Sequence, residues 1–182
     1  MIGNERNSDI VLLSSYAPLF CHEFDQTWLP DAIMFNSNSV YGKPSYWNQV
    51  LFSQNTPAGS VLLGYNASAI QPSVKTSPAP FTPGIPLFNN VLNITVSALI
   101  TSTGTISVKV VNYANVARSL NLVVNGAISG VCSIETISGS PLDTNTLEDP
   151  YNVVAVLVSD VPCSSSDSVT LAPYSINVIT FT

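Results

Sequence analysis

The side chains best suited to chemistry are carboxylates, which occur at intervals along the chain: Glu5 with Asp9, Glu23 with Asp25, Asp31, and Glu148 with Asp149. Two carboxyl groups support acid–base catalysis when their surroundings keep one protonated and the other ionised. Glu5 and Asp9 flank Arg6, so a salt bridge with Arg6 or another neighbour is the expected role. Glu148 and Asp149 precede a proline in a predicted turn, where carboxylates are normally solvated. None of these surroundings predicts catalysis.

The single histidine, His22, lies between Cys21 and Glu23. A metal site needs three or four ligands that converge, whereas adjacent residues of a chain do not share one face. We therefore expect no metal ion and no cofactor, and we interpret His22 as a hydrogen-bonded loop residue. The sequence also lacks a nucleophile elbow, a phosphate-binding glycine loop and a paired Cys motif.

A strand and a helix are expected to position these residues. The apolar run over residues 9–20 (DIVLLSSYAPLF) is typical of a strand buried on both faces. Pro44 and Ser45 then open a predicted helix, with Ser45 accepting free backbone N–H groups. One strand and one helix cannot close a parallel sheet, so this unit predicts a larger α/β body.

The chain changes character after Ser53. Pro and Gly interrupt residues 53–92, which predicts turns and a connector, with one short candidate strand at residues 59–65. From Leu92 onward apolar and polar residues alternate, bounded by turn signals such as Asn125-Gly126. The alternation covers residues 94–100, 106–110, 120–124, 153–157, 169–171 and 176–178. These short strands predict a mainly β fold with an antiparallel, jelly-roll-like β-sandwich.

Composition limits the partners. The 182 residues are 46% hydrophobic, which is enough for a real core, and 9% charged, with a formal net charge of -6. A negatively charged chain without a basic stripe is unsuited to nucleic acid. No apolar segment reaches the roughly 20 residues of a membrane-spanning helix, and no export leader opens the chain. We expect neither nucleic acid nor a membrane as a partner.

Cysteines and glycosylation motifs bear on the compartment. Cys132 and Cys163 lie in the β-rich part and could pair, leaving Cys21 over, although small buried hydrophobic residues are an equally good interpretation. Asn66 and Asn93 each begin an N-glycosylation motif. We expect an extracellular, secreted glycoprotein whose signal peptide is not in this sequence.

Several ordered motifs resemble a known family. They are GNERNSD from Gly3, SYAPLF from Ser15, Trp28 with PDAI from Pro30, YGKPSYW from Tyr41, KVVNY from Lys109, LDTNTLEDP from Leu142 and LAPYS from Leu171. Together they resemble the C-terminal part of plant and fungal α-L-arabinofuranosidases of glycoside hydrolase family fifty-one. The motifs run from the first residues to the last.

The resemblance implies both an architecture and an activity. Residues 1–55 would be the final strand, loop and helix of a (β/α)8 catalytic barrel, and residues 56–182 the C-terminal β-sandwich with a Pro-rich connector at 72–86. The family's enzymes remove terminal α-L-arabinofuranosyl residues from arabinoxylan and arabinan with retention, in L-arabinose metabolism. The two catalytic glutamates would precede Met1, which begins without a helix cap. We therefore expect a truncated chain, catalytically inactive alone; a naturally short protein is the alternative.

The loop after the predicted barrel strand would lie at the rim of the active site. Trp28 on this loop could stack on a sugar ring, although core packing is an equally good interpretation. We expect Trp28 and Asp31 to bind substrate, an arabinose-containing polysaccharide or oligosaccharide. The alternative function is a non-catalytic carbohydrate-binding or structural β-sandwich module.

Overall fold

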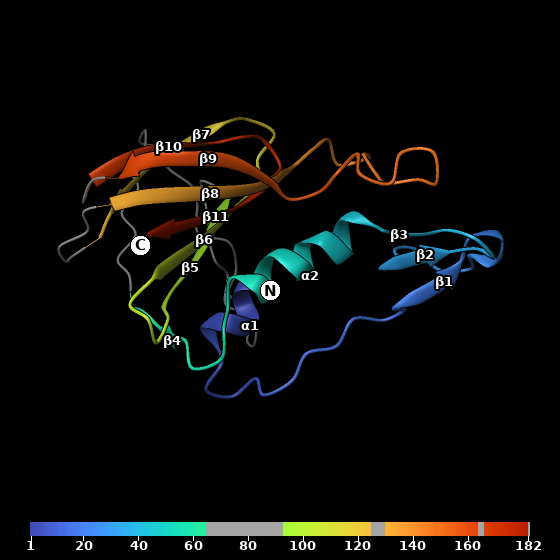
Figure 1. Cartoon of the computed structure of the whole chain (residues 1–182), viewed down its shortest axis with the longest axis horizontal. Helices are drawn as coiled ribbons and strands as arrows, with labels where there is room; N and C mark the ends of the chain where they lie inside the picture. Colours follow the sequence, from blue (N-terminus) through green and yellow to red (C-terminus); the bar gives the residue numbers. More distant parts are fainter. Residues whose placement is uncertain (65–92, 125–129, 164–165, 182) are drawn as a thin grey trace, which may run out of the picture.

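The computed structural model describes residues 1–64, 93–124, 130–163 and 166–181, with the backbone alone at 130–131, 159–163 and 166–167. The described chain has a β-sandwich, a helix along one face of its larger sheet, and a small lobe at the far end of that helix (Figure 1). The Asn125-Gly126 turn, the connector at 72–86 and Asn66 lie outside the described residues.

Within the described residues the sandwich has eight strands. They are β4 (Val61–Leu62), β5 (Ile94–Ile100), β6 (Ile106–Asn112), β7 (Arg118–Val123), β8 (Gly130–Ser138), β9 (Val156–Cys163), β10 (Ser166–Leu171) and β11 (Ser175–Phe181). Six form an antiparallel sheet in the order β4-β5-β6-β11-β8-β9, and β10 pairs with β7 in a second antiparallel sheet. The predicted mainly β, antiparallel fold is confirmed. The expected strand at residues 59–65 is present only as the two-residue β4.

The larger sheet is covered on both faces, because successive side chains of a strand point to opposite sides. Between the two sheets lies a buried cluster that includes Val108, Val110, Ile179 and Phe181. On the other face Val178 and Ile137 pack with Leu51 of the helix α2 (Pro44–Gln54). Neighbouring residues of β11 thus belong to different cores.

The helix α2 confirms the helix predicted from Pro44, but it begins differently. Lys43 is its N-cap residue and Pro44 occupies the first turn, where its missing N–H costs nothing. Ser45 lies inside the helix and donates to the carbonyl of Asp31 at 3.3 Å, so it does not cap the N–H groups as expected. This bond ties the start of α2 to the preceding loop.

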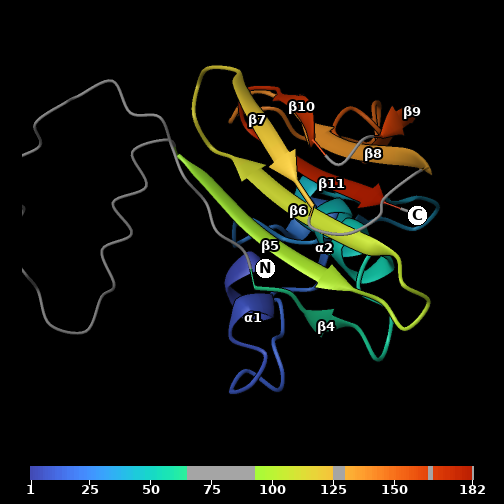
Figure 2. The same cartoon turned by 90° about the vertical axis from the view of Figure 1, so that its left-hand side faces the viewer.

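A second helix, α1 (Ile2–Arg6), lies beside β5 (Figure 2). Its Glu5 carboxylate pairs with the ammonium of Lys109, a fully buried residue of β6. Ser97 donates to the same carboxylate at 2.6 Å, and Lys109 also contacts the hydroxyl of Thr56. The salt bridge expected for Glu5 is therefore present, with a sandwich residue as its partner.

The strand predicted over residues 9–20 is wrong. Residues 11–19 are not in a strand, and Ile10, Leu12 and Leu13 are 74%, 91% and 87% exposed. A strand buried on both faces needs hydrogen-bonded neighbours and covering layers. Nothing in the described part of the chain supplies these around residues 11–17. Residues 11–19 of the apolar run are therefore irregular and largely exposed.

Residues 18–43 form what we call the N-terminal lobe. Its strands are β1 (Phe20–His22), β2 (Ile33–Phe35) and β3 (Val40–Gly42), with a 3-10 helix over Glu23–Asp25. β1 pairs with β2 in parallel, and β2 pairs with β3 in antiparallel. The lobe thus contains two short parallel strands where the sequence predicted one longer strand.

Candidate functional site

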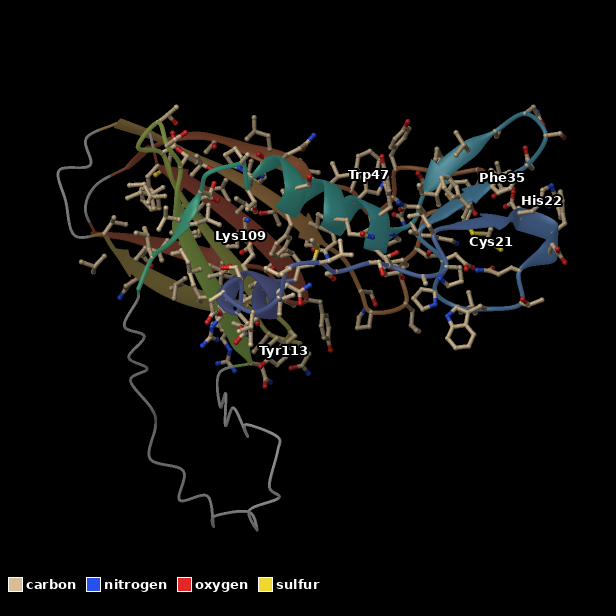
Figure 3. All side chains as sticks on the ribbon, turned by 90° about the horizontal axis from the view of Figure 1, so that it is seen from below. Cys21, His22, Phe35, Trp47, Lys109 and Tyr113 are labelled. Carbon is tan, nitrogen blue, oxygen red and sulfur yellow. The ribbon has the colours of Figure 1, made fainter. Side chains whose placement is uncertain are left out.

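The carboxyl ends of the two parallel strands bring polar residues together. His22 ends β1 and Glu23 follows it, while Phe35 ends β2 and Asn36 follows it. In sheets built from parallel strands, ligands bind beyond the carboxyl ends, because the connecting loops converge there. Figure 3 shows His22 and Phe35 side by side at the end of the lobe farthest from the sandwich. We treat this edge as the candidate site.

Glu23 is the carboxylate of this edge. It accepts from the Tyr41 hydroxyl at 3.4 Å and from the Asn36 amide at 3.5 Å, and it is half-buried. Tyr41 is buried. Burial raises the pKa of the Tyr41 hydroxyl, and the nearby Glu23 and Glu148 carboxylates raise it further. Tyr41 therefore stays protonated at neutral pH and can donate to Glu23.

Asn36 also stabilises the turn that follows β2. Its side-chain oxygen accepts from the backbone N–H groups of Asn38 at 3.1 Å and Ser39 at 2.9 Å. Such Asx-type contacts stabilise the turn between β2 and β3. With its oxygen held by the backbone, the amide nitrogen is oriented toward Glu23.

His22 is a hydrogen-bonded loop residue, as predicted. Its Nδ1 accepts from the Phe24 backbone N–H at 3.4 Å. In a neutral imidazole the proton then resides on Nε2, which makes that nitrogen a donor. The ring lies between Phe24 and Phe35, at centroid distances of 5.8 and 5.5 Å. The exposed side of this edge thus combines a donor with aromatic carbon.

The two residues predicted to bind substrate lie in different surroundings. Trp28 is 63% exposed, so its ring is not packed in a core within this chain. Asp31 is only 1% exposed, and its carboxylate accepts from the Gln26 amide at 2.6 Å. The loop therefore exposes the tryptophan while it uses Asp31 internally. A sugar contact remains a prediction for Trp28, whereas the burial of Asp31 favours a structural role.

Cys21 lies close to the carboxylates of Asp31 and Asp25. Its thiol is free, and its pKa is raised by burial and by the neighbouring Asp31 and Asp25. A raised pKa keeps the sulfur protonated and poorly nucleophilic. This environment does not support Cys21 as a nucleophile.

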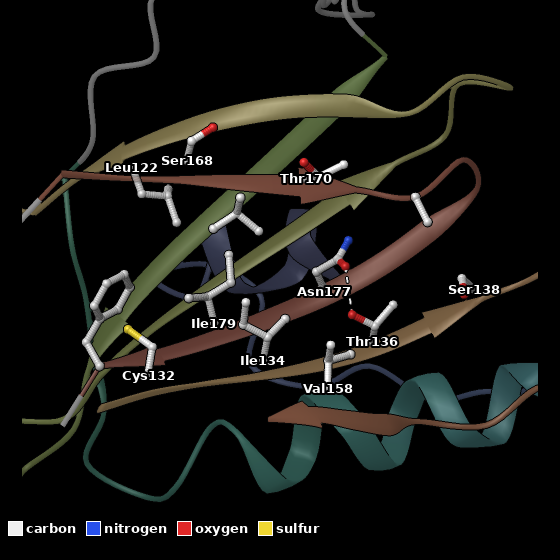
Figure 4. A pocket seen from close by; sticks show the side chains of 13 residues that line it. Leu122, Cys132, Ile134, Thr136, Ser138, Val158, Ser168, Thr170, Asn177 and Ile179 are labelled. Atoms are coloured by element: carbon white, nitrogen blue, oxygen red, sulfur yellow. Dashed lines mark hydrogen bonds between the residues drawn. The ribbon is translucent and has the colours of Figure 1, made fainter. Parts of the chain in front are cut away.

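A cavity of about 500 Å³ lies within the sandwich, between β8 and β11 on one side and β7 and β10 on the other. In Figure 4, Thr136 donates to Asn177 at 2.9 Å across its floor. Leu122, Ile134 and Ile179 supply apolar walls. Phe181 is the single aromatic residue among the described lining residues, and it is buried. The cavity therefore offers no exposed aromatic face for a sugar.

Of the predicted disulfide and glycosylation residues, the structure describes the side chains of Cys132 and Asn93. Cys132 is disulfide-bonded, while the side chain of Cys163 lies outside the described residues. Their pairing stays a prediction. Asn93 is exposed directly before β5, which makes its amide accessible to modification. Glycosylation at Asn93 and Asn66 also stays a prediction.

Sequence reasoning did not assign Glu23, Asn36 and Tyr41 to one site. The available signal was that polar residues follow both DAIMF, at 31–35, and the end of SYAPLF, at 15–20. The sequence predicted one long strand over 9–20 and no strand at 33–35. Without the second parallel strand, nothing indicated that these polar residues share an edge. The register of Phe20 with Ile33 and of His22 with Phe35 decides that these residues meet.

The known proteins that this chain resembles in sequence include several named alpha-L-arabinofuranosidases. Alpha-L-arabinofuranosidase 2 of Arabidopsis thaliana is 32% identical over 157 residues, covering 85% of this chain and 20% of the relative. An extracellular exo-alpha-L-arabinofuranosidase of Streptomyces chartreusis is 44% identical over 55 residues, covering 30% of this chain and 7% of the relative. The chain spans about a fifth of the length of the Arabidopsis relatives it matches.

Solved structures agree with these relatives. An arabinose-bound GH51 α-L-arabinofuranosidase matches 100% of this chain and 26% of its own, with a TM-score of 0.80 and 27% identity. The GH51 arabinofuranosidase of Xanthomonas axonopodis, at 14% identity, shares the fold over 98% of this chain and 33% of its own, with a TM-score of 0.73. The family model described as the alpha-L-arabinofuranosidase C-terminal domain matches residues 1–175. The chain therefore belongs to this C-terminal domain family of the glycoside hydrolase family 51 arabinofuranosidases.

Proposed function

We propose that this chain is the C-terminal part of a secreted, retaining α-L-arabinofuranosidase. The complete enzyme removes terminal α-L-arabinofuranosyl residues from arabinoxylan or arabinan. Retaining hydrolysis needs two carboxyl groups about 5 Å apart, one as acid–base and one as nucleophile. In this proposal the remainder of the enzyme supplies both groups, while the chain supplies the sandwich and part of the rim of the site.

The observation that carries the proposal is the parallel pair β1 and β2. Parallel strands occur almost only in sheets whose two faces are covered by other layers. Here the pair is short, and, besides Trp28 and Phe35, the segment around it exposes further large apolar side chains: Ile10, Leu12, Leu13, Leu19, Phe20, Phe24, Leu29 and Val40. Exposed apolar groups on this scale mark a surface that packs against further protein.

We infer that residues 1–55 complete a (β/α)8 catalytic barrel, contributing β1, β2 and the covering helix α2. This assignment differs from the sequence-based one in that the barrel gains two parallel strands from this chain. The Glu5–Lys109 pair and the contact of α2 with the sandwich would then hold the barrel and the sandwich together. Residues 56–182 form the sandwich side of that contact.

An assay of the complete enzyme tests the proposal. The full-length protein that contains this chain is expected to release nitrophenol from 4-nitrophenyl α-L-arabinofuranoside, and the 182-residue chain alone is not. Absence of turnover by the folded full-length protein would contradict the proposed activity. Turnover by the purified chain above a denatured control would contradict the assignment of catalysis to the remainder.

A non-catalytic carbohydrate-binding module is the competing function. The sandwich cavity, with the Thr136, Ser168 and Thr170 hydroxyls in its lining, is the observation that favours it. Retention of the whole chain on insoluble arabinoxylan, released by soluble arabinoxylan, would support a binding module. Passage of the chain through the same matrix would leave the sandwich as a structural partner of the barrel.

A further inference from the structure

We propose that His22 and Glu23 bind the hydroxyl groups of the arabinofuranosyl substrate, and that Tyr41 and Asn36 hold the Glu23 carboxylate in position. This inference rests on the proposed function, because it places these residues at the rim of the arabinofuranosidase site. It assigns a binding role to side chains that the sequence placed in no substrate contact, and it replaces Asp31 as the sugar-binding carboxylate of the loop.

The position of the two residues is the first argument. His22 pairs with Phe35 in the parallel register, so both residues lie at the same carboxyl edge, and Glu23 lies one residue beyond. In barrels of parallel strands that edge forms the active-site face. Asp31 lies before β2, at the opposite end of the strand from Asn36. The register therefore separates Glu23, at the active-site edge, from the buried Asp31.

The hydrogen-bonding capacity of Glu23 is the second argument. A carboxylate can accept about four hydrogen bonds. The described side chains donate two to Glu23, from the Tyr41 hydroxyl at 3.4 Å and the Asn36 amide at 3.5 Å, and both are longer than the usual upper limits of about 3.0 Å for O–H donors and about 3.2 Å for N–H donors. Glu23 therefore keeps acceptor capacity for sugar hydroxyl groups, which are good donors. Asp31, by contrast, has a short bond to Gln26 at 2.6 Å.

The chemistry of the surrounding surface is the third argument. Sugars present alternating hydroxyl groups and apolar C–H faces, so their sites combine donors, acceptors and aromatic carbon. His22 offers Nε2–H as a donor because Nδ1 is occupied by the Phe24 N–H. The exposed ring of Phe35 offers the apolar part beside it. This edge therefore matches a neutral sugar.

Kinetics of the full-length enzyme on 4-nitrophenyl α-L-arabinofuranoside test the inference. Glu23→Gln is expected to lower kcat/KM roughly 10- to 100-fold, the usual consequence of losing a hydrogen bond to a charged group. His22→Ala is expected to lower kcat/KM by about 5- to 10-fold, as expected for a neutral hydrogen bond. Tyr41→Phe should raise KM by less than Glu23→Gln and leave kcat unchanged.

Asp25→Asn is the matched control. Asp25 is an exposed carboxylate on the same 3-10 helix, two residues after Glu23, so the substitution removes the same charge. It should leave kcat/KM within a factor of about two, as for a surface substitution. Thermal protection by L-arabinose gives a second readout, which should be present in wild type and Asp25→Asn and lost in Glu23→Gln.

The outcomes separate the two proposals. An inactive wild-type enzyme contradicts the proposed function. An active wild type in which Glu23→Gln and His22→Ala behave like Asp25→Asn overturns the binding role alone. If Glu23→Gln fails to fold, His22→Ala decides the question, because the exposed His22 ring can be removed without disturbing a core.

Discussion

The sandwich and the N-terminal lobe use β-strands in opposite ways. The sandwich joins antiparallel strands and buries apolar residues on both faces of its larger sheet. The lobe pairs two short strands in parallel and leaves much of its apolar surface exposed. Antiparallel strands connected in sequence can cover one another within a single domain, whereas parallel strands need further layers. This difference supports the proposal that the lobe packs against further protein of the complete enzyme, whereas the sandwich is covered by its second sheet and by the helices α1 and α2.

The largest expected effect concerns the ion pair that joins the helix α1 to the sandwich. Lys109→Met leaves the Glu5 carboxylate without its buried partner, which should reduce the free energy of unfolding by about 3–5 kcal/mol. The double variant Glu5→Gln with Lys109→Met should recover much of this loss, since no uncompensated charge remains. Thermal or urea unfolding of both variants measures the difference. A loss below 1 kcal/mol for Lys109→Met, where ~1 kcal/mol is typical of exposed pairs, would mean that this junction contributes little.

Two leucine substitutions give the sharpest contrast, one in the buried contact of α2 with the sheet and one in the exposed segment before the lobe. Leu51→Ala opens a cavity between α2 and the sheet and should reduce the free energy of unfolding by about 2–5 kcal/mol. Leu12→Ala, at an exposed site, should change it by less than about 0.5 kcal/mol in the isolated chain. In the full-length enzyme the Leu12 substitution should become costly, because the docking surface is then buried. Equal, small effects of Leu12→Ala in both proteins would argue against docking there.

The disulfide should stabilise the sandwich and not the lobe. Cys132→Ser and Cys163→Ser, in protein produced under oxidising conditions, should each reduce the free energy of unfolding by about 2–4 kcal/mol. Cys21→Ser removes a free thiol and serves as the control. Mass spectrometry after thiol labelling without reduction identifies the bonded residues. Labelling of both Cys132 and Cys163 would contradict their pairing.

The smallest expected effect is a change in how the free energy of unfolding depends on pH in the alkaline range. Burial lowers the pKa of Lys109 below 10.5, so between the folded and unfolded values the unfolded state binds more protons and stability rises with pH. The raised pKa of Tyr41 has the opposite sign, and stability is lost as pH rises from 10.0 through the folded value. The free energy of unfolding is measured for wild type, Lys109→Met and Tyr41→Phe between pH 8 and 11. Lys109→Met should lose the contribution that rises with pH, and Tyr41→Phe should lose the contribution that falls with pH. Identical slopes in all three proteins would contradict both assignments.

Most of the sandwich could be predicted from the sequence, because most of its strands alternate between apolar and polar residues. β8 escaped the prediction. Its Ile134 and Ile137 are an odd number of residues apart and pack in different clusters, since this inner strand is covered on both faces. Apolar residues at this odd spacing do not give a period of two. The helix α2 was predicted by Pro44 and helical spacing, although its capping residue was not.

The sequence by itself determined the alternating strands, the helix after Pro44 and the motifs that place the chain in its family. Only the tertiary structure decided which polar residues meet. The pairing of Glu5 with Lys109 joins residues far apart in the chain, and the contacts of Glu23 with Asn36 and Tyr41 depend on the register of β1, β2 and β3. Local patterns report which face of an element is apolar, whereas strand register is set by the packing of whole elements.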